Sequence, residues 1–208
     1  MTRRAVVVPL LPLDWCPPGI DAQHWRAALA EDLADLINGL AEAEPALAVA
    51  EADAPLAAAV RWPTTRVYEQ PRLDLAELCT ALHADGYAQV AMIAPDAPDL
   101  PAMLIGKLLR PLSSRPVAIA PAQGGGLSGF AVRLPVPPWL AWPLLDFAKP
   151  DVDMSGLRAR APRPGDVATA PGWHRLNGAD GLARLDPAIE GWEATRALLY
   201  AGSHPGPA

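Results

Sequence analysis

The stretch VAMIAPDAPDLPAMLIGKLL, Val90 to Leu109, decides the fold. Its first part is a short apolar run closed by a proline, which is typical of a strand buried on both faces of a sheet. From Pro101 onward the apolar residues have helical spacing, and proline is favoured in the first turn of a helix. Two acids, Asp96 and Asp99, lie between these segments. The stretch therefore predicts a strand, a tight loop and a helix, with carboxylates where the strand ends.

Segments of the same two kinds precede and follow this stretch. Helical spacing of apolar residues predicts helices at 22–43, 54–60, 73–86, 101–112 and 190–202. Runs typical of strands occupy 3–10, 46–52, 65–70, 89–94, 116–122 and 128–134. Strands and helices that alternate with short connections indicate an α/β protein with a mostly parallel sheet. We therefore expect a Rossmann-like three-layer sandwich.

The composition predicts one globular domain. Of the 208 residues, 51% are hydrophobic and 19% are charged, which suffices for one substantial core. We expect residues 1–208 to form this domain, with an α/β core over 1–134. The segment 135–208 is rich in proline, and we expect it to contribute loops and a C-terminal helix that pack on the core.

Charge and cysteine usage limit the partners and the compartment. The net charge is -6 without a Lys/Arg cluster, which disfavours nucleic acid as the main partner. The first apolar run is broken by Pro9 and Pro12, which favours a strand over a signal peptide, and no apolar stretch is long enough to span a membrane. Cys16 and Cys79 are far apart and form no CxxC pair. A reduced, cytoplasmic setting is therefore expected.

Three loops are candidates for a binding site, because ligands of open α/β sheets bind at the carboxyl ends of strands. They are the loop after the first strand, the loop with Asp96 and Asp99, and the loop QGGGLSG at 123–129. Asp99 lies where a residue would cap the following helix, and we interpret it as such a cap. Asp96 is not required for this cap. It is either a loop residue or a ligand for a hard divalent cation.

The glycine run in the third loop also allows two interpretations. Gly124, Gly125 and Gly126 can adopt positive φ and expose backbone N–H groups, which could hold a phosphate. A hairpin turn needs glycine as well. The loop lacks the Lys-Ser or Lys-Thr of a P-loop and does not match GxGxxG. Both interpretations therefore stay open.

Tryptophans in the proline-rich segments are a further candidate for ligand contacts. Trp139, Trp142 and Trp173 lie between prolines in the last third of the chain. They could stack on a base or sugar, or they could cover an edge of the core or form the contact of a homodimer. The pattern does not decide between these roles.

Taken together, Val90 to Val132 resembles a known family. A D-x-P-x-L-P loop, an amphipathic helix, a strand ending in proline and a glycine loop are similar to the bacterial glycosyltransferase-like family related to the phospholactate and molybdenum-cofactor guanylyltransferases. This resemblance implies a nucleotide-diphospho-sugar transferase fold of GT-A type, a nucleotide or nucleotide sugar as ligand, and Mg²⁺ or Mn²⁺ as cofactor. It also implies that Asp96 and Asp186 hold the metal and that Gly124 to Gly126 line the phosphate or base.

The chain departs from this family near its N-terminus. Members carry a lysine-rich loop, whereas LLPLDWCPPGIDAQHWR keeps Gly19 but has no lysine, and its first basic residue after the glycine is Arg26. Gly19 and Arg26 remain the candidates for nucleotide contacts there. Removing one group that stabilises developing negative charge commonly costs about 10² to 10³ in rate. Two hypotheses follow: a metal-dependent transferase acting on a nucleotide or nucleotide sugar, or a catalytically inactive relative that binds a partner or small ligand.

Overall fold

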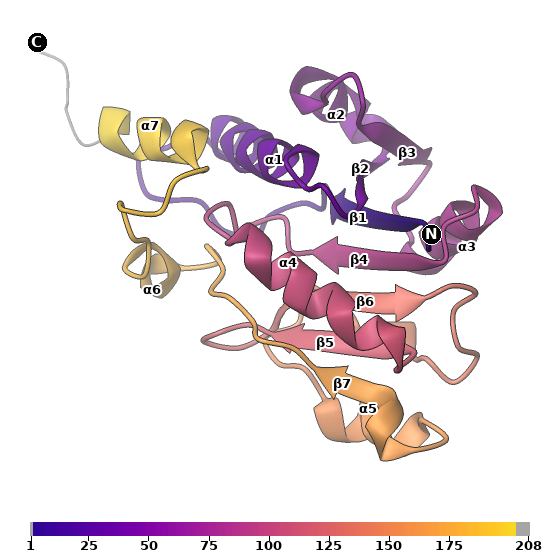
Figure 1. The fold of residues 1–208 in the computed structure, drawn as a ribbon. Coiled ribbons are helices and arrows are strands. Elements are labelled where there is room, and N and C mark those ends of the chain that lie inside the picture. The colour runs from indigo at the N-terminus through magenta and orange to yellow at the C-terminus, as the bar shows by residue number, and fades with distance from the viewer. Residues whose placement is uncertain (1, 203–208) are drawn as a thin grey trace, which may run out of the picture.

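The computed structural model describes residues 2–202. Within this range, seven strands form one sheet in the order β3-β2-β1-β4-β6-β5-β7 (Figure 1). The strands are β1 (Arg4–Pro9), β2 (Glu44–Ala50), β3 (Arg66–Gln70), β4 (Gln89–Ile93), β5 (Val117–Pro121), β6 (Leu127–Arg133) and β7 (Val167–Thr169). β6 runs antiparallel to β4 and β5, and the other neighbouring pairs are parallel. The expected Rossmann-like α/β fold with a mostly parallel sheet is confirmed.

Helices cover both faces of the sheet. They are α1 (Ala22–Asn38), α2 (Ala54–Val60), α3 (Leu75–Ala84), α4 (Ala102–Leu109), α5 (Met154–Arg160), α6 (Ala179–Leu182) and α7 (Glu193–Gly202). Short 3-10 turns lie at Glu51–Asp53, Arg110–Ser113, Trp142–Leu144 and Pro164–Asp166. α1, α2 and α4 pack on one face, whereas α3, α5 and the segment 140–147 pack on the other. This is the three-layer arrangement that the alternating pattern predicts.

The central strand β1 explains why its sequence is a continuous apolar run. Val6 and Val8 belong to the core on the side of α1 and α4, and Val7 belongs to the core on the side of α3. All three are fully buried. Because successive side chains of a strand point to opposite faces, a strand covered on both sides needs apolar residues at every position.

Aspartate side chains cap three of the described helices, α1, α3 and α5. The Asp21 carboxylate accepts hydrogen bonds from the backbone N–H groups of Gln23 and His24, both at 3.0 Å, and so caps α1. Asp74 caps α3 in the same way. Such a cap satisfies N–H groups that have no partner within the helix. α1 ends at Asn38, earlier than the expected residue 43, because the chain turns there into β2.

The segment after residue 134 contributes a strand that the sequence did not predict. β7 has only three residues in a proline-rich stretch, and it extends the sheet parallel to β5. The C-terminal helix α7 packs against α1, as Figure 1 shows. The buried carboxylate of Asp32 on α1 accepts hydrogen bonds from the N–H groups of Ala194 and Thr195 at 2.9 and 2.8 Å. Burial raises the pKa of this carboxyl, and the contact ties the end of the chain to the core.

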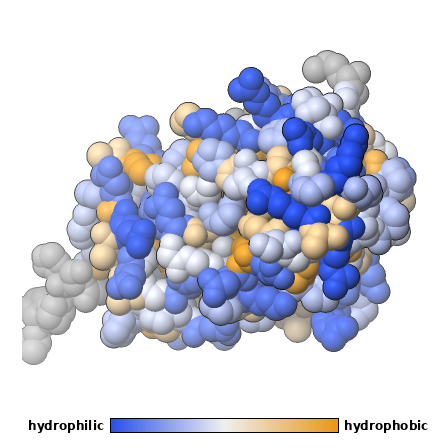
Figure 2. All heavy atoms as spheres, turned by 90° about the horizontal axis from the view of Figure 1, so that it is seen from below, coloured by the Kyte–Doolittle hydropathy of each residue, from blue (hydrophilic) through white to orange (hydrophobic). Residues whose placement is uncertain are grey.

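The surface beside β7 and α5 is mixed in polarity. Figure 2 shows hydrophilic residues spread over this face, with small apolar areas among them. Of the helices described here, none combines the length and the apolar character needed to cross a membrane.

Candidate functional site

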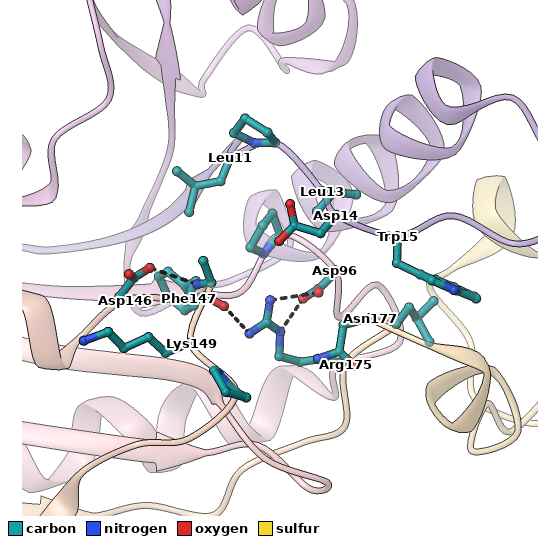
Figure 3. A pocket seen from close by; sticks show the side chains of 15 residues that line it. Leu11, Leu13, Asp14, Trp15, Asp96, Asp146, Phe147, Lys149, Arg175 and Asn177 are labelled. Atoms are coloured by element: carbon teal, nitrogen blue, oxygen red, sulfur yellow. Dashed lines mark hydrogen bonds and ion pairs between the residues drawn. The ribbon is translucent and has the colours of Figure 1, made fainter.

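A pocket of about 460 Å³ opens where β1 and β4 end (Figure 3). Four loops surround it: one after β1, one after β4, one after the Trp142–Leu144 turn, and one after β7. Its lining residues are Leu11, Pro12, Leu13, Asp14, Trp15, Pro95, Asp96, Asp146, Phe147, Ala148, Lys149, Pro150, Arg175, Leu176 and Asn177. The pocket therefore lies at the carboxyl edge of the parallel strands, where the sequence placed the candidate loops.

The position of the pocket within the sheet is also specific. After β1 the chain continues to β2 on one side, whereas β4 pairs with β1 on the other side. The loops that follow β1 and β4 therefore diverge and leave a crevice between them. Such a topological switch point is where open α/β sheets bind their ligands.

A buried ion pair between Asp96 and Arg175 forms the floor of the pocket. Arg175 Nε donates to Asp96 Oδ1 at 2.6 Å, and Nη2 donates to Oδ2 at 2.9 Å. Figure 3 shows the guanidinium directed at the carboxylate from the loop that follows β7. The Asp96 residue is 3% exposed and Arg175 is 8% exposed. Both carboxylate oxygens are thus held by a cation within the protein.

Arg175 is also held by backbone carbonyls. Its Nη1 donates to the carbonyl oxygen of Phe147 at 2.6 Å and to that of Leu127 at 3.4 Å. The side chain therefore joins the loop after β4, the start of β6 and the segment around Phe147. An arginine with this many fixed contacts orients three walls of the pocket.

Asp99 does not cap α4, and the interpretation as a helix cap is wrong. The residue preceding α4 is Pro101, and no side chain accepts a hydrogen bond from the first turn. Asp99 is instead buried, and its carboxylate accepts a hydrogen bond from Trp173 Nε1 at 3.1 Å. Its other oxygen lies 3.0 Å from Nε2 of the buried His174. The acid is directed inward, where Trp173 Nε1 supplies one hydrogen bond, whereas Asp99 Oδ2 and His174 Nε2 lie at ion-pair distance without hydrogen-bond geometry.

The glycine loop combines positive φ angles with close packing. Gly124, Gly125 and Gly126 have φ of +93°, +108° and +80°, a region that favours glycine. A Cβ on Gly125 would lie 2.5 Å from the carbonyl oxygen of Pro150, and one on Gly126 would lie 3.0 Å from that of Lys149. Gly125 and Gly126 therefore let the loop approach the segment 149–150. A ligand role for Gly124 to Gly126 stays a prediction.

A second pocket of about 370 Å³ adjoins the first beside this loop. Gly124, Arg184 and Asn177 line it, and Arg175 borders both pockets. Arg184 is exposed, and its Nη2 would lie 3.9 Å from a Cβ on Gly124. A cation thus lies next to the glycine of the loop that faces solvent, in a pocket that Asp180 also lines. Arg184 is the group there that could hold an anion.

The structure places Gly19 and Arg26 outside the lining of both pockets. Gly19 is exposed with φ of +81°. Arg26 forms a bidentate ion pair with Asp53 at 2.7 Å, and its Nη2 also donates to the carbonyl oxygen of Leu10 at 2.6 Å. These hydrogen bonds hold the pKa of Asp53 below its usual value. Contacts of Gly19 and Arg26 with a nucleotide stay a prediction, and Arg26 would have to leave Asp53 to make one.

The expected metal ligands are not arranged for a cation in this conformation. Asp186 is exposed, lies outside the lining of both pockets, and accepts a hydrogen bond from the N–H of Ala188 at 2.8 Å. Both oxygens of Asp96 are engaged by Arg175. Within residues 2–202, no three or more His, Cys, Asp or Glu side chains come together as a metal site. The residues present therefore do not fit a metal at Asp96 unless Arg175 moves.

The tryptophans of the proline-rich segments contact the protein itself. Trp142 packs edge-on against Phe130, with 6.3 Å between the ring centroids, and Trp139 contacts the same core. Trp173 donates to Asp99. The aromatic side chains that do line the first pocket are Trp15, which packs edge-on against Trp25, and the buried Phe147.

Several charged residues of the site had no local signal in the sequence. Arg175 follows Trp173 and His174 in a stretch that reads as an irregular loop, 79 residues from its partner Asp96. Asp14, Asp146 and Lys149 lie in loops as well. Only the folded chain brings these side chains to one edge of the sheet.

Solved structures with the same fold include nucleotide-sugar and nucleotidyl enzymes. A protein from Desulfovibrio desulfuricans G20, assigned as a nucleotide-diphospho-sugar transferase, is 20% identical, with 98% of this chain and 96% of that chain covered and a TM-score of 0.72. For 4-diphosphocytidyl-2C-methyl-D-erythritol synthase from Anaerococcus prevotii DSM 20548, the identity is 12%, the coverage 95% and 96%, and the TM-score 0.59.

A third structure contains bound ligands. It is glucosyl-3-phosphoglycerate synthase from Mycobacterium tuberculosis in complex with Mn²⁺, uridine diphosphate and glucosyl-3-phosphoglycerate. The identity is 19%, the coverage 97% of this chain and 80% of that chain, and the TM-score 0.53. At these identities the likeness shows the fold. It confirms the expected nucleotide-diphospho-sugar transferase fold of GT-A type.

The family follows from the sequence match. The comparison with curated proteins found no match. Residues 33–140, just over half of the chain, match the model of a family described as "Uncharacterized protein conserved in bacteria (DUF2064)". This range contains Asp96, Asp99 and the glycine loop. The chain belongs to the DUF2064 family.

Proposed function

We propose that this protein binds a nucleotide or nucleotide sugar in the pocket between the loops after β1 and β4, as a nucleotidyltransferase-like or glycosyltransferase-like protein. The observation that carries the proposal is the location of the pocket at the topological switch point of a GT-A type sheet. The volume of about 460 Å³ is within the range of small-molecule sites.

The lining supports separate places for the base and the phosphates. Leu11, Leu13 and Trp15 offer apolar and aromatic surface on the loop after β1, which suits the ring of a base or sugar. Arg184 lies beside Gly124, where it can meet phosphate oxygens. The ammonium of Lys149 donates to the carbonyl oxygen of Pro143 and would have to turn toward a ligand in the first pocket. The base would then lie near Trp15 and the phosphates near Gly124.

The nature of the nucleotide is the finer part of the proposal. The resemblance to phospholactate and molybdenum-cofactor guanylyltransferases makes guanine nucleotides the first to test. Uridine diphosphate is bound in the structure of the mycobacterial synthase, which makes uridine nucleotides and their sugars the second. The proposed function contains no metal-dependent step at Asp96, because both oxygens of that carboxylate accept hydrogen bonds from Arg175.

Thermal unfolding with a panel of nucleotides and nucleotide sugars tests the proposal. A ligand at 100 times its Kd stabilises a protein by about 2.7 kcal/mol. For a chain of this size that raises the melting temperature by roughly 5 to 10 °C. Each ligand is measured with and without Mg²⁺ or Mn²⁺, and Trp15→Ala is the matched variant. If no nucleotide at millimolar concentration moves the midpoint, the proposed function is wrong.

A second candidate is a relative that binds a ligand without transferring a group. One observation favours it: Arg26, the first basic residue after Gly19 in the lysine-free N-terminal loop, is held by Asp53 and by the Leu10 carbonyl. A cation in that position is not available to stabilise charge that develops during transfer. Binding of a nucleotide without release of pyrophosphate or nucleoside diphosphate, across a panel of acceptors, would support this second candidate.

A further inference from the structure

Asp96, the carboxylate that would coordinate a metal ion in this pocket, is already paired with the guanidinium cation of Arg175. Asp96 accepts two hydrogen bonds from Arg175, at 2.6 and 2.9 Å, in the side-by-side geometry that guanidinium and carboxylate prefer. The side chains are 4% and 8% exposed. Arg175 takes one lone pair of each oxygen, and a metal ion brought to the remaining lone pairs of this buried carboxylate would be repelled by the guanidinium.

The guanidinium cannot leave easily or lose its charge. Arg175 Nη1 is held by the carbonyl oxygens of Phe147 and Leu127, so that moving the side chain breaks contacts with two further segments. Arginine also stays protonated at any pH that a folded protein tolerates. Its positive charge is therefore a permanent part of the pocket floor, whereas a bound metal would come and go with its concentration.

We propose that Arg175 takes the place of a divalent cation at Asp96, so that this pocket binds its ligand without a metal. The part of the inference that concerns a ligand rests on the proposed function. The part that concerns Asp96 and metal ions rests on the ion pair alone.

Charge balance gives the inference a further consequence. A divalent ion on one carboxylate leaves a net charge of plus one, whereas arginine on one carboxylate leaves none. Attraction for phosphate must therefore come from cations outside the pair. Lys149 in the first pocket and Arg184 in the second are the basic side chains in these positions, and they face Asp14 and Asp146 in the first pocket and Asp180 in the second. Lys149 also donates to the carbonyl oxygen of Pro143, so Arg184 is the freer of the two cations.

Binding of Mn²⁺ alone, followed by electron paramagnetic resonance of the free ion, tests the role of Asp96 directly. We expect wild-type protein and Asp96→Asn to give the same Mn²⁺ binding curve. Arg175→Met keeps the length of the side chain but frees the carboxylate, so we expect it to bind Mn²⁺ at least about tenfold more tightly than wild type. The double variant Arg175→Met/Asp96→Asn should lose that gain.

The outcomes separate the alternatives even if Arg175→Met does not fold. Wild-type protein that binds Mn²⁺ and loses it in Asp96→Asn would overturn the inference, because Asp96 would then be a metal ligand in the presence of Arg175. Equal curves for these two proteins support it. Wild type and Asp96→Asn both keep Arg175, so this comparison does not depend on whether Arg175→Met folds.

A nucleotide completes the test. The ligand that gives the largest thermal shift is measured again in excess EDTA, and we expect a shift of the same size. A shift that disappears in EDTA overturns the inference while it supports the proposed function. If no nucleotide gives a shift under any condition, the proposed function fails, and the Mn²⁺ curves still decide whether Arg175 occupies the position of the cation.

Discussion

Two arginine–carboxylate pairs of the same geometry lie at opposite edges of the sheet and differ in their burial. At the amino edge, Arg3 donates to both oxygens of Glu44 at 2.7 Å, and the side chains are 38% and 47% exposed. At the carboxyl edge, Arg175 and Asp96 make the same contact with side chains 8% and 4% exposed. The contact between the two charged groups is the same at both edges, and its access to water differs.

Burial changes what such a pair does for the protein. Water screens the charges of Arg3 and Glu44, so either residue can be lost at little cost. Removing one partner of a buried pair leaves a charge that neither water nor protein compensates. The pair at the carboxyl edge is therefore a fixed part of the pocket, whereas the pair at the amino edge is an ordinary surface contact.

The largest expected effect is on the buried pair. Arg175→Met should lower the free energy of unfolding by about 3 to 5 kcal/mol, because the Asp96 carboxylate is left unpaired. Denaturant titration followed by circular dichroism measures this change. Arg175→Met/Asp96→Leu removes both charges and should recover most of the loss. If Arg175→Met lowers the free energy of unfolding by less than about 1 kcal/mol, the buried pair contributes no more than an exposed ion pair does.

The next effect is on ligand affinity and leaves stability unchanged. Arg184→Ala should weaken binding of a nucleotide di- or triphosphate about tenfold, because a hydrogen bond to a charged group is lost. Isothermal titration calorimetry measures the affinity. Arg61→Ala, which removes another exposed arginine near the amino end of β3, is the control. Equal affinity in the two variants would contradict the placement of phosphate beside Gly124.

A pair of intermediate burial should give an intermediate effect on stability. Arg26 and Asp53 have side chains that are 21% and 26% exposed. Arg26→Ala should lower the free energy of unfolding by about 1 kcal/mol. The same denaturant titration measures it. A loss of stability as large as that of Arg175→Met would show that burial does not determine how much each ion pair contributes to stability.

The smallest effect is the pH dependence of the exposed pair. Hydrogen bonds from Arg3 and then Tyr87 lower the pKa of Glu44 to about 2 from 4.5. Because the folded value is lower than the unfolded value, the contribution of Glu44 is present above pH 4.5 and is lost as the pH falls toward 2. The stability difference between wild type and Glu44→Gln, measured by thermal unfolding, should shrink over this range. A difference that does not change with pH would show that the contact does not persist in solution.

The elements that the sequence predicts well are those whose local pattern agrees with their environment. The run that forms β4 is buried on both faces, and the helical spacing after Pro101 becomes α4. β7 could not be predicted, because three residues in a proline-rich segment carry no periodicity. Its place in the sheet comes from pairing with β5, which is a contact between distant parts of the chain.

The site shows the same division. Asp96 could be singled out because it follows a buried strand, and the glycine loop because of its composition. The partner of Asp96 could not, since Arg175 lies 79 residues away in a segment without regular pattern. The surroundings of Asp99 could not be predicted for the same reason: the neighbouring rings of Trp173 and His174 come close only when the last third of the chain packs on the sheet.

Hydrogen exchange measured by mass spectrometry, with and without the best nucleotide in EDTA, tests the central claim most directly. We expect slower exchange in the carboxyl-edge loops 11–15, 95–99 and 173–177, and no change at the amino edge around 85–88. Protection at the amino edge, or no protection at either edge with a nucleotide that is bound, would contradict a metal-free nucleotide site at the switch point between β1 and β4.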